Sequence, residues 1–203
     1  LFRSYKFDNY IQITCNRSEL RRGGGGGVAI LVNSRYHVQT LAKFTSTTVS
    51  ALWTLIKTEE LDHPMICCVL YHPPGLRKQQ KEATIDHIYD TVKKLTCKHK
   101  SASLLLYGDF NDLNTSSLEQ ALGLTQIVDF PTRENAHLDK MYTNIPEYVQ
   151  TRCSLLPPIG NSDHESAVLE TAFKRPVQYE SITKRKVTPA AKIKISQQLE
   201  EQN

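Results

Sequence analysis

Short apolar runs, set apart by polar segments rich in Gly and Pro, recur along the chain and predict a series of buried strands. Residues 28–32 (VAILV) follow five consecutive glycines, which suit a turn or loop. Residues 48–57 (TVSALWTLIK) and 65–71 (MICCVLY) are joined by the polar segment TEELDHP, so this pair predicts a hairpin. Further strands are expected at residues 103–107, 124–129, 138–143, 151–156 and 166–172.

One helical pattern is long. Between residues 85 and 95 the apolar side chains recur three and four positions apart, which is the stripe that an amphipathic helix buries. The stripe consists of Ile85, Ile88, Tyr89, Val92 and Leu95. Ser116 stands three residues before Glu119, a capping-box spacing that predicts a short second helix over LEQAL. Residues 1–27 are polar and irregular in pattern, and no element is predicted there.

The order of these elements favours an α/β fold, a sandwich of two sheets flanked by helices. We expect one domain over residues 1–173, because a chain of this length can bury a core of its own. From Lys174 onward the chain becomes polar and basic and contains Pro176 and Pro189. Residues 174–203 are therefore interpreted as a basic linker or tail.

The charge is unevenly placed along the 203 residues, whose formal net charge is +4. Residues 1–100 hold 15 basic and 8 acidic side chains, whereas residues 101–173 hold 3 and 10. Two interpretations stay open: an uneven surface, or a carboxylate-rich cation site beside a surface that meets phosphate. No apolar run approaches the ~18 residues of a membrane span, and no leader pattern is visible. The five cysteines match no zinc spacing, and reduced thiols are expected.

Four short polar clusters stand at the expected ends of strands. They are Tyr71-His72-Pro73-Pro74, Gly108-Asp109-Phe110-Asn111, Leu138-Asp139 and Ser162-Asp163-His164. Each cluster alone is consistent with an ordinary turn or cap. Together they place three Asp, one Asn, one His and one Tyr at the C-terminal ends of apolar strands, where loops can bring side chains together.

Such a set fits metal-assisted hydrolysis of a phosphodiester. Carboxylates bind Mg²⁺, and the cation neutralises the charge of the phosphate. A carboxylate with a neighbouring amide can orient and deprotonate a water molecule. A His held by an Asp can donate a hydrogen bond to a phosphate oxygen, and a Tyr hydroxyl can hold the phosphate in line.

In this order, the clusters resemble the endonuclease/exonuclease/phosphatase superfamily, which includes DNase I, apurinic endonucleases and phosphoinositide phosphatases. The glycines before VAILV, the Tyr-x-Pro-Pro-Gly turn, Pro131-Thr132-Arg133 and the basic tail resemble the endonuclease domain of non-LTR retrotransposons, which precedes a reverse transcriptase. The resemblance covers about residues 1–172. It implies a DNase I-like fold, Mg²⁺ or Mn²⁺ as cofactor, DNA as substrate, a reverse transcriptase domain as partner and a nuclear location.

The resemblance also implies a role for each matching residue. Asp109 orients or activates the attacking water, and Asn111 holds the water and the phosphate. Tyr71 contacts the scissile phosphate. His164 contacts and polarises the same phosphate, and Asp139 orients its imidazole ring.

The metal side of the site matches the family less well. Asp163 is expected beside the metal, and Ser162 is expected to support the turn that carries it. The family begins with a strand that bears an Asn and a second strand whose Glu is the principal metal ligand; neither motif is found, so we expect the fold to lack its first strands. Lys140 also replaces the apolar residue expected after Asp139.

Three functions therefore stay open. The leading expectation is nicking of target DNA by a retrotransposon endonuclease domain, with weak or absent activity in this chain. The first alternative is a non-catalytic remnant or a domesticated module that binds nucleic acid or protein. The second is another phosphoesterase of the same fold, acting on lipid or nucleotide phosphates.

Overall fold

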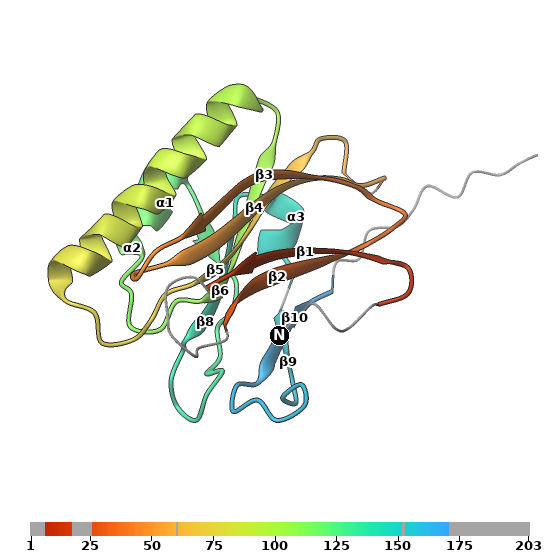
Figure 1. The fold of residues 1–203 in the computed structure, drawn as a ribbon. Helices are drawn as coiled ribbons and strands as arrows, with labels where there is room; N and C mark the ends of the chain where they lie inside the picture. The colour runs from red at the N-terminus through yellow and green to blue at the C-terminus, as the bar shows by residue number, and fades with distance from the viewer. Residues whose placement is uncertain (1–6, 18–25, 60, 152, 171–203) are drawn as a thin grey trace, which may run out of the picture. The chain divides into compact units, whose positions relative to one another are not determined.

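The computed structural model describes residues 7–17, 26–59, 61–151 and 153–170, which belong to one compact unit over residues 1–173. The predicted tail, residues 174–203, lies outside the described residues. The elements, drawn in Figure 1, are in chain order β1 (Tyr10–Asn16), β2 (Gly27–Asn33), β3 (His37–Thr45), β4 (Ser50–Lys57), β5 (Met65–Tyr71), α1 (Lys78–Lys98), β6 (Ser103–Asp109), α2 (Ser116–Leu122), β7 (Thr125–Gln126), β8 (Asp139–Thr143), α3 (Pro146–Val149), β9 (Cys153–Leu156) and β10 (Ser166–Leu169).

A six-stranded mixed sheet lies at the centre, with the strand order β3-β4-β5-β6-β8-β7. Its strands pair antiparallel except for β5 and β6, which are parallel and are joined through the long helix α1. The hairpin β1-β2 and the pair β9-β10 form two further antiparallel sheets. The α/β class that the sequence predicted is confirmed, as is the predicted hairpin of β4 and β5.

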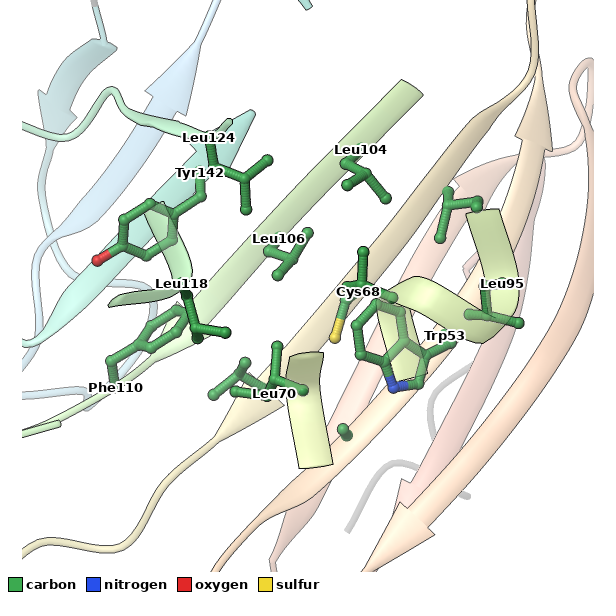
Figure 2. Packing of buried hydrophobic residues seen from close by; sticks show 14 of the residues in the cluster. Trp53, Cys68, Leu70, Leu95, Leu104, Leu106, Phe110, Leu118, Leu124 and Tyr142 are labelled. Atoms are coloured by element: carbon green, nitrogen blue, oxygen red, sulfur yellow. The ribbon is translucent and has the colours of Figure 1, made fainter. Parts of the chain in front are cut away.

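The two faces of the central sheet are buried by different elements. Helix α1 covers one face, and the hairpin β1-β2 lies on the other (Figure 1). On the helix face, Trp53, Cys68 and Leu106 pack in one cluster with Leu95 of α1 (Figure 2). On the hairpin face, Cys67 packs with residues of β1 and β2. Because β5 is buried on both faces, it appears in the sequence as a continuous apolar run.

Two sequence expectations about strands were wrong. Residues 10–16 were expected to be irregular but form β1, paired with β2 from Tyr10 opposite Asn33 to Asn16 opposite Gly27. Residues 124–129 were expected to form a strand, but only Thr125–Gln126 pair with β8. After one more hydrogen bond, from Ile127 N to the Met141 carbonyl (2.9 Å), the chain leaves the sheet and packs into a small separate cluster.

The start of the second helix also differs from the prediction. Ser116 is the first residue of α2, and the N-cap is Thr115. The Thr115 hydroxyl donates to Glu119 Oε1 (3.2 Å) and lies 2.6 Å from the Tyr142 hydroxyl. The side-chain partner of Glu119 is therefore Thr115 and not Ser116, the residue that the capping-box spacing suggested. Thr115 is held in the core by its contact with Tyr142 of β8.

Two simple expectations can be compared directly with the structure. The five cysteines form no disulfide, and burial raises the pKa of the Cys67 thiol to about 12. Among the helices that the structure describes, none combines the length and the apolar character needed to cross a bilayer.

Candidate active site

Three of the predicted side chains stand side by side at one edge of the central sheet. Tyr71 ends β5 and lies opposite Asp109, which ends β6; Asp109 in turn lies opposite Asp139 of β8. We call these three residues the strand-end row. The sequence placed Asp139 at the C-terminal end of a strand, which was wrong, since Asp139 opens β8. It still joins the row because β8 runs antiparallel to β6, so that the start of one strand meets the end of the other.

The residues on either side of Asp109, at the end of β6, fix its backbone. Gly108 has a φ of +145°, and a Cβ there would overlap the backbone carbonyl oxygen of Leu70 on the neighbouring strand, so only glycine fits. The next side chain, Phe110, is fully buried in the helix-side cluster, and its N–H donates to the Leu138 carbonyl (2.8 Å). The close approach of β5 and the buried ring together fix the backbone on both sides of Asp109.

Asn111 closes the turn after β6 through both its backbone and its side chain. It has a φ of +46°, which Asn tolerates better than most residues. Its N–H donates to Asp109 Oδ1 (3.0 Å), and its Nδ2 donates to the His72 carbonyl (2.8 Å). The His72 N–H donates to the Asp109 carbonyl (2.9 Å), while the buried His72 ring is anchored by Nδ1 to the Thr48 carbonyl (2.9 Å). Asp109 and Asn111 are therefore held by the segment that follows Tyr71.

His164 joins the row through an ion pair. Its Nδ1 lies 2.7 Å from Asp139 Oδ2, which leaves Nε2 on the other side of the ring for a substrate. Thr132, fully buried, fixes both partners: its Oγ1 accepts from the Asp139 N–H (3.0 Å), and its carbonyl accepts from the Glu165 N–H (2.7 Å). The Oγ of Ser162 accepts from the His164 N–H (3.1 Å), the supporting position predicted for it.

The pKa of the Asp109 carboxyl is raised, as suits a general base. Burial raises the pKa of the Asp109 carboxyl, and the negative charge of Asp139 raises it further. The hydrogen bonds from Asn111 and the charge of His164 act in the opposite direction on this pKa. Asp109, Asp139 and His164 thus act on one another electrostatically, as the members of one site do.

The structure does not bring Asp163 into this network. Its carboxylate is 68% exposed and pairs with the guanidinium of Arg133, with 2.8 Å between Oδ2 and Nη2. Within the part of the chain that the structure describes, no three His, Cys, Asp or Glu side chains gather as metal ligands do. Mg²⁺ is usually held by only one or two carboxylates together with water and substrate phosphate, so the roles assigned to these residues do not depend on a bound metal.

Lys140 shows how the departure from the family pattern is accommodated. Its side chain is half-buried, and burial lowers the pKa of the ammonium group. The Nζ donates to the Leu113 carbonyl (3.1 Å), so that the charge keeps a polar partner where an apolar residue was expected.

Sequence reasoning missed two residues that touch the row. His72 belongs to the Tyr71-His72-Pro73-Pro74 cluster, but the sequence indicates no role for it. Arg17 was not considered at all, although its guanidinium carbon lies 5.1 Å from the centre of the Tyr71 ring. No local signal could have found Arg17, because the contact depends on how the hairpin β1-β2 packs on the sheet.

A cleft of about 510 Å³ lies elsewhere, between α1 and the segment that precedes α2. Lys81 and Asp112 line it and form an ion pair of 2.6 Å between Nζ and Oδ2. No residue of the strand-end row lines this cleft, so it does not belong to the candidate site.

Comparison with solved structures identifies the architecture. An endonuclease/exonuclease/phosphatase family protein from Bacteroides thetaiotaomicron superposes with a TM-score of 0.58 at 14% identity, over 80% of this chain and 73% of that one. The chain has the endonuclease/exonuclease/phosphatase fold. A mannosyl-6-phosphatase from the same species gives a TM-score of 0.56 at 14% identity, over 82% of this chain and 78% of that one.

A third structure with this fold is TDP2 from D. rerio complexed with a single-strand DNA product. Its TM-score is 0.52 at 10% identity, over 79% of this chain and 76% of that one. No protein-family model matches the sequence, and no curated protein matches it either. The superpositions establish the fold, but at identities this low they do not establish the function. The argument for function therefore rests on the site.

Proposed function

We propose that the chain hydrolyses phosphodiester bonds and that its substrate is DNA. The observation that carries this proposal is the convergence of two hydrogen-bonded pairs on one edge of the sheet. One pair is His164 with Asp139, and the other is Asp109 with Asn111. A partly buried carboxylate beside an imidazole whose second nitrogen stays available is the arrangement that acid–base chemistry at a phosphate requires.

Each residue has one step in the proposed reaction. Asp109, whose pKa is raised by burial, accepts a proton from water as the water oxygen attacks phosphorus. Nε2 of His164 donates a hydrogen bond to a non-bridging phosphate oxygen, and Asp139 holds the ring in place. Tyr71 contacts the same phosphate from the neighbouring strand. The bond to the leaving sugar oxygen breaks, and that oxygen takes a proton from solvent.

The finer parts of the proposal come from the sequence resemblance. We propose that the chain nicks target DNA for a non-LTR retrotransposon, with a reverse transcriptase domain as its partner and the nucleus as its place of action. Mg²⁺, or Mn²⁺ in its place, is the proposed cofactor, because a cation offsets the charge of the phosphate. The DNA product in the TDP2 structure supports DNA as substrate, whereas the mannosyl-6-phosphatase shows that this fold also serves sugar phosphates.

Nicking of supercoiled plasmid tests the proposal. The purified chain should convert supercoiled DNA slowly to the open circular form in Mg²⁺ or Mn²⁺, and EDTA should stop the conversion. Asp109→Asn and His164→Gln should each lower the initial rate by about 100-fold or more, the contribution typical of general acid–base groups. The rates are measured from gel-resolved time courses.

Matched substitutions on the exposed surface serve as controls. Asp90→Asn on α1 and His37→Gln at the start of β3 make the same chemical changes away from the row and should leave the rate unchanged. Nicking that survives in both site variants would contradict the proposal. A wild-type chain that nicks plasmid neither in Mg²⁺ nor in Mn²⁺ would contradict it too. That result would favour the non-catalytic, nucleic-acid-binding alternative.

A further inference from the structure

Arg17 places a positive charge next to Tyr71 of the candidate site. It directly follows β1, and its backbone N–H donates to the Gly26 carbonyl (3.0 Å), which extends the pairing of the β1-β2 hairpin. The side chain is only 8% exposed, and its guanidinium carbon lies 5.1 Å from the centre of the Tyr71 ring. The first hairpin therefore places a buried cation against the first residue of the strand-end row.

This cation has no anionic partner among residues 7–17, 26–59, 61–151 and 153–170. The buried Nε of Arg17 lacks any hydrogen-bond acceptor, and the guanidinium forms no ion pair with the described residues. A cation–π contact offsets only part of the cost of taking a guanidinium out of water. Buried charges are normally paired, so this side chain points to an anion that the described residues do not supply.

The charges around the row indicate what kind of anion fits. Asp109 and Asp139 repel a phosphate, so a cation must offset them before a phosphodiester can approach. The Arg133 guanidinium near the site is engaged by Asp163, and the His164 ring is engaged by Asp139. Among the described residues nothing neutralises the charge of Arg17, and a planar guanidinium matches the geometry of phosphate oxygens.

We propose that Arg17 is a phosphate-binding residue, which holds a non-bridging oxygen of the DNA backbone on the Tyr71 side of the row. This inference rests on the proposed function, because it names the substrate contact of the same site. It concerns binding rather than bond cleavage, so it predicts an effect that is present without any metal ion.

Binding of DNA in EDTA tests the inference. Fluorescence anisotropy of a labelled duplex of about 20 base pairs is measured over a range of NaCl concentrations for the full chain and its variants. Arg17→Gln should weaken binding by about tenfold, the scale of one charge-assisted hydrogen bond. It should also reduce the slope of log K against log[NaCl] by about 1, because one phosphate contact is lost. Arg17→Lys should keep the slope of log K against log[NaCl], because it keeps the charge. It should bind DNA less tightly than the wild type, because it loses the planar, bidentate guanidinium.

Lys94→Gln is the matched control, because it removes one positive charge from an exposed position on α1. It should change neither the affinity nor the slope appreciably. Thermal unfolding of Arg17→Gln separates a structural role from a binding role: removing an unpaired buried charge should leave the melting temperature equal or higher. A lower melting temperature with unchanged DNA affinity would overturn the inference.

The outcomes also separate this inference from the proposed function. Loss of DNA affinity in Arg17→Gln, in a chain that never nicks plasmid, would support the phosphate contact and contradict hydrolysis. Normal nicking with unchanged affinity and salt slope in Arg17→Gln would overturn the phosphate contact and leave hydrolysis standing. A wild-type chain that does not bind the duplex would overturn the contact as well.

Discussion

Asp109 is held both by Asn111 of its own motif and by the backbone of His72, which lies outside that motif. The sequence identified the carboxylate and its neighbour Asn111, because both follow an apolar strand in a recognisable order. It could not identify His72 as their support, since that role depends on β5 lying parallel to β6 with Tyr71 opposite Asp109. The residues that the structure brings together at the strand ends were thus predictable, and the residues that position them were not.

His72 should make the stability of the protein sensitive to acid. Burial lowers the pKa of His72, whose buried Nε2 has no partner that could share a proton. The unfolded chain protonates its histidines near pH 6.5, so below that pH it binds more protons than the folded chain. The free energy of unfolding should therefore fall as the pH drops from about 6.5 toward 5, with a slope of up to ~1.4 kcal/mol per pH unit from this residue.

The variant His72→Asn isolates this effect. Its side-chain amide can still donate to the Thr48 carbonyl but takes up no proton. Urea unfolding is followed through the fluorescence of the single tryptophan. The difference in the free energy of unfolding between wild type and variant should be constant above pH 7. Below pH 6.5 the wild type should lose stability relative to the variant. His37→Asn, at an exposed position, is the control. Parallel curves for wild type and His72→Asn across this range would show that His72 does not carry the effect.

At the scale of elements, the sequence predicted the strands that coincide with short apolar runs and missed β1 and β3, in which polar and apolar residues are mixed. The runs at β2, β4, β5 and β6 were identified because nearly every side chain in them is apolar. Strand β3 is an edge strand and β1 belongs to a partly exposed hairpin, so polar residues alternate with apolar ones in both. Such alternation is a weaker signal, and its β-character depends on the strands that pair with it.

Thr132 hydrogen-bonds both to Asp139 and to Glu165, the neighbour of His164, and the contribution of these bonds can be measured. Thr132→Val removes the oxygen that accepts from the Asp139 N–H, while the shape of the side chain is kept. An unpaired buried N–H costs ~1–3 kcal/mol, so the free energy of unfolding should fall by about that amount. The nicking rate should fall too, because Asp139 then holds His164 less firmly.

Thr125→Val is the control for this change, because Thr125 is exposed and valine is at least as favourable in a strand. It should alter the free energy of unfolding by less than about 0.5 kcal/mol. If Thr132→Val is as stable as the wild type in urea unfolding and nicks plasmid equally fast, Thr132 does not position Asp139.

At the scale of the whole molecule, the uneven charge of the sequence acquires a structural meaning. The acidic segment, residues 101–173, supplies Asp109, Asp139 and Asp163, whereas Arg17 comes from the basic segment that precedes it. The fold brings the two segments together, since β1 and β2 pack on the sheet face opposite α1. The sequence left open whether the uneven charge is merely an uneven surface or marks a carboxylate-rich site beside basic surface, and only the packed structure shows that Arg17 contacts the row itself.

The central claim is that Asp109, the last residue of β6, and His164, in the segment before β10, act as one catalytic unit at the edge of the sheet. Initial nicking rates in Mg²⁺ for the wild type, Asp109→Asn, His164→Gln and the double variant test it most directly. Residues that act as a unit are non-additive, so the double variant should be no more than a few-fold slower than the slower single variant. A double variant whose loss equals the product of the two single losses would show that the two residues act independently and would contradict the account.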